Sequence, residues 1–127
     1  MPQRREVRVV QLATKTDNQA PVATIDRSQL ARMTFGDRNL EREVLQLFDR
    51  QAGLLLARMH SGAPPVVATL AHTLKGSATS IGATGVMQAA AAVEQAVSAS
   101  ERERALGRLA AAIDEAQAAI AELLDAR

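Results

Sequence analysis

Residues 64–81 of this chain read PPVVATLAHTLKGSATSI, and their pattern of side chains indicates the class of fold. Apolar or small side chains recur in it at alternating three- and four-residue steps, at Val67, Leu70, Leu74, Ser77 and Ile81. That spacing is typical of an amphipathic α-helix with one face in a core. The two prolines at its start fit the first turn of a helix, where no intrahelical N–H bond is lost.

Two helices are predicted upstream of this stretch. Asp26 can cap a short helix, with Gln29 reaching back to complete a capping box. That helix would bury Leu30 and Met33 and stop near Gly36. Asp37 can cap a longer helix that ends at residues 61–63. Its apolar stripe is predicted to be Leu40, Val44, Leu47, Phe48, Leu54, Leu55 and Met59.

Two further helices are predicted downstream, after a turn at residues 82–85. The first would bury Val86, Ala90, Val93 and Val97. After a break at residues 98–100, Ser100 and Glu103 form a capping box for the last helix. The last helix would bury Leu106, Leu109, Ile113, Ala116, Ile120 and Leu123 or Leu124.

None of these helices would be stable alone, but their apolar stripes can share one core. The sequence therefore predicts an all-α fold over residues 25–127, an antiparallel up-down four-helix bundle with an additional short N-terminal helix. Residues 1–24 lack helical periodicity and contain two prolines. We expect them to form a weakly structured tail or an arm lying on the bundle.

Composition excludes several classes of function. The 127 residues suffice for one domain, and the absence of cysteine excludes disulfides and thiolate chemistry. A net charge of +1, with no Trp and no Tyr, argues against nucleic-acid binding. The apolar runs are far shorter than the roughly 18 residues of a membrane span. The N-terminus has no apolar segment of a secretory signal, so we expect a cytoplasmic protein.

His72 is the candidate reactive residue. If the apolar positions of residues 64–81 face the core, His72 lies on the outer face of that helix, with Lys75 and Gly76 three and four residues on. The other neighbours on that face are small, namely Ala68, Thr69 and Thr79. A glycine inside a helix costs about 1 kcal/mol relative to alanine, so Gly76 suggests that a partner approaches the imidazole closely.

The charge pattern suits an anionic partner. No carboxylate occurs from Arg50 through Val93, and His72 and Lys75 lie near the middle of that stretch. An incoming phosphoryl group would therefore meet little like charge. Chance in an alanine-rich segment is the alternative explanation of this pattern.

Hairpin geometry adds Glu94 to the candidate site. His72 lies 11 residues before Ala83, at the centre of the predicted turn, and Glu94 lies 11 residues after it. At a rise of about 1.5 Å per residue, the two would sit at the same level of neighbouring helices. Glu94 could then accept a hydrogen bond from Nδ1–H of His72 and leave Nε2 free for attack. An ordinary solvated glutamate is the alternative.

These residues carry a resemblance to a known family. Residues 71–78 read AHTLKGSA and residues 81–83 read IGA, which resembles the signature of the histidine-containing phosphotransfer (HPt) domain of bacterial phosphorelays. The resemblance extends to residues 44–48 (VLQLF) and to residues 93–94 (VE), and covers roughly residues 25–127. It implies that His72 is the phosphoacceptor through Nε2, Lys75 balances phosphoryl charge, Gly76 gives access and Glu94 orients the ring.

The expected function is that of a phosphorelay intermediate. A receiver-domain aspartyl phosphate would phosphorylate His72, and a second receiver would take the group on. The chain has no acidic cluster, so the receiver is expected to bring Mg²⁺, and no intrinsic metal or cofactor is expected. There is no phosphate-binding loop for ATP, so autonomous kinase activity is not expected. The partners would be receiver domains, a hybrid histidine kinase or both, bound by a monomer, with no nucleic acid and no membrane.

Three other interpretations stay open at this point. A dimeric kinase-like phosphotransferase would place an acidic residue and soon afterwards a proline after the histidine, whereas Thr73 follows His72. A helical adaptor would dock a receiver or kinase without phosphotransfer. A metal site is weakly supported, because His60 and His72 fall on different predicted helices.

Overall fold

The computed structural model describes residues 24–125, which contain five helices and no strand. The helices are α1 (Arg27–Thr34), α2 (Arg38–Ser61), α3 (Pro64–Ile81), α4 (Thr84–Gln95) and α5 (Ala99–Asp125). The predicted all-α class is confirmed over these residues. Apart from Thr24, the predicted N-terminal tail lies outside the described residues.

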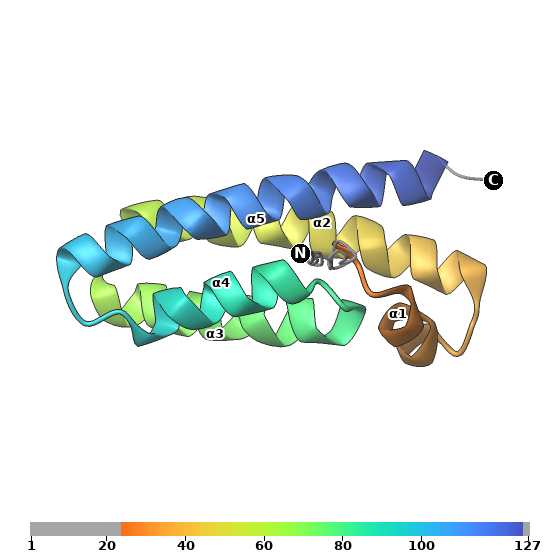
Figure 1. Ribbon diagram of the computed structural model, residues 1–127, viewed down its shortest axis with the longest axis horizontal. Coiled ribbons are helices and arrows are strands. Elements are labelled where there is room, and N and C mark those ends of the chain that lie inside the picture. Colours follow the sequence, from red (N-terminus) through yellow and green to blue (C-terminus); the bar gives the residue numbers. More distant parts are fainter. Residues whose placement is uncertain (1–23, 126–127) are drawn as a thin grey trace, which may run out of the picture.

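The four longer helices contact one another in a closed ring. α2 packs against α3, α3 against α4, α4 against α5, and α5 against α2. Figure 1 shows these helices side by side along the long axis, with α1 at one end, where it contacts α2 and α3. No helix within residues 24–125 is long and apolar enough to cross a membrane.

The buried stripe of α3 contains more alanine than the sequence pattern suggested. Its buried residues are Val67, Ala71, Leu74, Ala78 and Ile81. The predicted members Leu70 and Ser77 are only half-buried. The prediction relied on the spacing of large apolar side chains, whereas the small residues Ala71 and Ala78 are the ones with no exposed surface.

On α2, three leucines predicted in the core are exposed. Leu40, Leu47 and Leu54, which we call the leucine row, are 37%, 60% and 67% exposed. The buried residues of this helix are Leu45, Phe48, Ala52, Leu55 and Met59. The three leucines repeat every seven residues, so they lie along one side of the helix, beside the face that meets the core. The prediction failed because α2 carries more leucines than one buried face can hold.

Two further core predictions are wrong. Met33 is 45% exposed, since α1 turns Leu30 and Thr34 inward and the Thr34 hydroxyl donates to the Leu30 carbonyl at 2.9 Å. Val97 is 85% exposed, because α4 ends at Gln95 and Val97 lies in the link to α5. In the last helix, Leu106, Leu109, Ile113, Ala116 and Ile120 are buried as predicted.

The start of α1 is tied to the turn between α3 and α4. Asp26 caps α1 by accepting from the backbone N–H groups of Ser28 and Gln29, and its own N–H donates to the Gly82 carbonyl at 2.8 Å. The Gln29 amide donates to the Ser80 carbonyl at 3.4 Å, so the predicted return of Gln29 to Asp26 is wrong. Tertiary contact with α3 replaces the local capping box.

Gly82 is required at that turn. Its φ of +78° lies in the left-handed region, and a Cβ there would come within 2.6 Å of the Asp26 carbonyl oxygen. A side chain at this position would therefore be strained and would also push α1 away from the turn.

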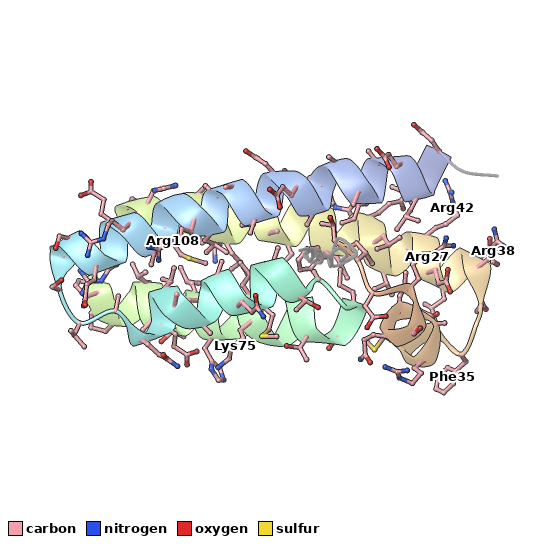
Figure 2. All side chains as sticks on the ribbon, in the orientation of Figure 1. Arg27, Phe35, Arg38, Arg42, Lys75 and Arg108 are labelled. Carbon is pink, nitrogen blue, oxygen red and sulfur yellow. The ribbon has the colours of Figure 1, made fainter. Side chains whose placement is uncertain are left out.

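The end of α1 is marked by an unusual residue. Phe35 follows the helix with a φ of 56°, a left-handed conformation that few non-glycine residues adopt. Its side chain is 92% exposed, and Figure 2 shows it beside α1, away from the rest of the molecule. The aromatic ring therefore adds almost nothing to the core.

The cap of α5 lies two residues before the predicted one. The Ser98 hydroxyl accepts from the Glu101 N–H at 3.1 Å, and Glu101 Oε1 accepts from the N–H groups of Val97 and Ser98 at 3.0 and 3.2 Å. The pKa of Glu101 is lowered by these two backbone hydrogen bonds, first by the one from Val97 and then by the one from Ser98. Ser98 and Ser100 both match the capping-box spacing, and the structure uses Ser98, which lets α5 begin at Ala99.

Candidate functional site

His72 lies on the outer side of α3. Its side chain is 67% exposed, while Ala71, one residue before it, and Leu74, two residues after it, are fully buried. The prediction that His72 faces outward is therefore confirmed. An imidazole in this position is open to a partner as large as a protein domain.

Glu94 holds one nitrogen of the imidazole. Nδ1 of His72 lies 2.8 Å from Oε2 of Glu94, which comes from α4. The contact joins neighbouring helices at the same distance from their connecting turn, as the hairpin register predicted.

Lys75 binds the other oxygen of the same carboxylate. Its Nζ lies 2.8 Å from Oε1 of Glu94. Oε1 is shielded from solvent, and the ammonium group forms an ion pair with it. His72, Lys75 and Glu94 thus form one group, which we call the histidine cluster.

The sequence pattern does not predict the Lys75–Glu94 contact. It pairs Lys75 with an incoming phosphoryl group and gives no partner for it in the free protein. The signal was present, because a residue three positions after His72 lies on nearly the same side of α3. Figure 2 shows Lys75 at the edge of the α3–α4 pair, away from α2 and α5.

The ionisation of Glu94 fixes the tautomer of the neutral imidazole. The pKa of Glu94 is lowered, first by the Lys75 ammonium and then by the His72 ring. Glu94 is therefore ionised at neutral pH and can only accept hydrogen bonds. Nδ1 of His72 must carry the proton that it donates, so Nε2 of the neutral ring keeps its lone pair and faces away from Glu94.

Gly76 leaves open space beside the imidazole. A Cβ built on this residue would meet no heavy atom within 4 Å. Packing inside the chain therefore does not require glycine here, although glycine costs a helix about 1 kcal/mol relative to alanine. The open space is available to whatever approaches His72.

The remaining residues predicted on this face are small and internally satisfied. Ala68 is half-buried, and Thr69 and Thr79 are exposed. The hydroxyl of Thr69 donates to the Pro65 carbonyl at 3.1 Å, and that of Thr79 donates to the Lys75 carbonyl at 2.8 Å. Neither hydroxyl needs a further donor or acceptor, so a partner could cover this face without leaving them unpaired.

The two histidines lie on different helices, His60 on α2 and His72 on α3. Within residues 24–125, no group of three or more His, Cys, Asp or Glu side chains is arranged to hold a metal ion.

A comparison with protein families identifies the class of this chain. The model of the Hpt domain matches residues 39–126, which is more than half of the chain. The chain therefore belongs to the Hpt domain family, whose members serve histidine phosphotransfer in phosphorelays. No curated protein and no solved structure matches the chain. The matched range begins within α2, so α1 lies outside it.

Proposed function

We propose that this chain is a phosphorelay intermediate that accepts a phosphoryl group on His72 from a receiver-domain aspartyl phosphate and passes it to another receiver. The observation that carries this proposal is an exposed imidazole whose Nδ1 is held by an ionised carboxylate at 2.8 Å. That arrangement leaves Nε2 as a nucleophile on an accessible surface.

The chemistry needs no group from this chain beyond the cluster. The Nε2 lone pair attacks phosphorus, the bond between phosphorus and the aspartyl oxygen breaks, and the receiver carboxylate leaves. The ring keeps its proton on Nδ1 and becomes cationic, and Glu94 stabilises that charge through the same hydrogen bond. Transfer to a second receiver reverses these bond changes.

Lys75 and Gly76 have supporting roles in this proposal. The phosphoryl group arriving on Nε2 brings negative charge close to the Lys75 ammonium, which then divides its interaction between Glu94 and the phosphoryl oxygens. Gly76 gives the donor room to reach Nε2 in line. Phosphoryl transfer depends mainly on such positioning and charge compensation.

The rest of the molecule presents this site. We propose an antiparallel up-down four-helix bundle with α1 added, in which Ala68, Thr69, Gly76 and Thr79 form the docking face around His72. The receiver supplies Mg²⁺, the protein acts as a cytoplasmic monomer, and it has no kinase activity of its own. Receiver domains or a hybrid histidine kinase are the partners.

Phosphotransfer from purified, radiolabelled receiver domains tests this function. We expect the chain to acquire an acid-labile, base-stable label, and His72→Gln to abolish it. His60→Gln is the matched control, since His60 is exposed and lies on another helix. Label that persists on His72→Gln would refute the assignment. If no receiver labels the chain although one binds it, the adaptor interpretation holds.

A further inference from the structure

A second charged feature lies at the junction of α1, α2 and α5. A depression of about 340 Å³ is lined there by Arg27, Leu30, Arg38, Glu41, Arg42, Leu45 and Leu123. Figure 2 shows the three arginines gathered at one end of the molecule. None of the lining residues belongs to α3 or α4, so this depression, which we call the arginine pocket, is separate from the histidine cluster.

Within residues 24–125, the lining of the arginine pocket carries more positive than negative charge, with three arginines and one glutamate. In that part of the chain, the ion pairs to carboxylates are those of Glu94, and none involves Arg27, Arg38 or Arg42. Oε2 of Glu41, the carboxylate in the lining, lies 3.4 Å from the Thr34 hydroxyl, whose hydrogen is donated to Leu30 at the shorter distance. Arg42 uses Nη1 to donate to the Leu124 carbonyl at 2.8 Å, which leaves the other donors of its guanidinium group available.

The fold does not explain the presence of arginine at the first position of α1 and of α2. Arg27 and Arg38 are the first residues of α1 and α2, where the helix dipole disfavours a cation. Side-chain caps at both helix starts are already supplied by Asp26 and Asp37. The arginines therefore add unfavourable charge that neither capping nor packing requires.

The floor of the arginine pocket is apolar. Leu30 and Leu45 are buried, and Leu123 is half-buried. A guanidinium group binds phosphate or carboxylate through paired hydrogen bonds, whereas leucines accept an apolar group. The volume lies at the lower end of the roughly 300–1,000 Å³ found for small-molecule sites.

We propose that the arginine pocket binds a small organic anion, in which a phosphate or carboxylate group is carried on a compact apolar body. The guanidinium groups hold the anionic group, and the leucines contact the apolar body. This binding is independent of phosphotransfer and would add a ligand-responsive site to the domain.

Titration of the ¹⁵N-labelled full chain followed by NMR tests this proposal at constant ionic strength. The probes are phenyl phosphate, benzoate, inorganic phosphate and phenol. We expect saturable shifts confined to α1, the first half of α2 and the end of α5. Either phenyl phosphate or benzoate should bind more tightly than inorganic phosphate and phenol, and the tighter of the two identifies the anionic group.

Variants separate specific binding from general attraction to positive charge. Arg38→Gln should weaken binding of the tighter probe by about tenfold, because a hydrogen bond to a charged group is lost. Arg27→Gln should act similarly. Arg50→Gln is the matched control, since Arg50 is exposed on α2 but does not line the arginine pocket. The amide spectra of the variants show directly whether each remains folded.

Several results would overturn the proposal. They are the absence of saturation with both organic anions, shifts spread over α3 and α4, equal weakening by Arg50→Gln, and binding of phenol or inorganic phosphate as tight as that of the organic anions. Each of these can occur whether or not His72 accepts a phosphoryl group, so the two proposals succeed or fail separately.

Discussion

Glu94 uses its two carboxylate oxygens for two different partners, His72 through Oε2 and Lys75 through Oε1. One residue thereby sets the tautomer of the imidazole and holds the nearby cation. A single substitution at Glu94 disturbs both, whereas a substitution at Lys75 leaves the hydrogen bond to the ring in place.

We expect Glu94→Ala to slow phosphorylation of His72 by about tenfold or more, since a hydrogen bond to a charged group is worth roughly 1.5–3 kcal/mol. The rate of label transfer from a phosphorylated receiver measures this effect. The ¹⁵N shifts of the His72 ring should also change from one tautomer, protonated on Nδ1, to a mixture. Glu103→Ala, at an exposed position of α5, is the control. An unchanged tautomer in Glu94→Ala would contradict the role proposed for Glu94.

Gly76 gives a test in which stability and activity change in opposite directions. A side chain there meets nothing within 4 Å, so Gly76→Gln should stabilise α3 by up to about 1 kcal/mol through helix propensity. The same side chain should slow phosphoryl transfer by obstructing the approach to His72. Chemical denaturation and the transfer assay measure the two effects.

Gly107 of α5 is the matched control for Gly76. It is exposed, and a Cβ there also meets no atom within 4 Å. Gly107→Gln should raise stability to a similar extent and leave the transfer rate unchanged. Equal transfer rates in both variants would mean that the space beside Gly76 is not used by the donor.

At the level of the single helix, the cap of α5 uses only one of two serines that have the same spacing to a glutamate. Ser98→Ala should lower the free energy of unfolding by about 1 kcal/mol, because the Glu101 N–H loses its acceptor. Ser100→Ala should have little effect, since Ser100 lies inside α5. Urea denaturation of both variants measures the difference. A larger loss in Ser100→Ala would place the functional cap two residues later.

The boundaries and faces of the helices show how much of the fold the sequence could predict. The four breaks between helices were found because Gly, Pro and capping residues act locally, within one turn of the chain. The choice between Ser98 and Ser100 could not be made, because both satisfy the same local rule. The leucine row was misassigned for a related reason, since periodicity reports the spacing of leucines but not the width of the face that neighbouring helices cover.

At the scale of the whole molecule, the histidine cluster was largely predictable and its full set of contacts was not. The partner of His72 followed from a short hairpin, whose geometry fixes which residues lie level with each other. The contact between Lys75 and Glu94 depends on how a long side chain is directed across two helices, which spacing alone leaves open. The arginine pocket was not predictable, because its lining joins α1 and α2, which are neighbours in the sequence, to Leu123 near the end of α5.

Gly82 links α1 to the rest of the molecule, and its substitution should be costly. Gly82→Ala puts a Cβ within 2.6 Å of the Asp26 carbonyl oxygen and forces a left-handed conformation that costs roughly 1–2 kcal/mol by itself. We expect thermal denaturation to show a fall in the free energy of unfolding that is greater than this value. The rate of amide hydrogen exchange should rise first in α1. Gly85→Ala is the control, because Gly85 lies in α4 with no atom within 4 Å of its added Cβ. Gly85→Ala should stabilise the protein slightly, and a comparable loss in both variants would contradict this account of the turn.

The start of the described chain lies beside the last turns of α5. Thr24 and Ile25, which precede α1, line one depression together with Ala119, Glu122 and Leu123 of α5. A folded unit whose ends lie close together can be inserted into a loop of a host protein without distorting that loop. It can also be circularly permuted, with its original ends joined and new ends made in another loop. The link between α4 and α5 is exposed at Val97 and Ser98 and could take such a new opening, at the cost of the cap that Ser98 gives to α5. Cutting there would leave α3 and α4, and with them the histidine cluster, on one continuous piece of chain.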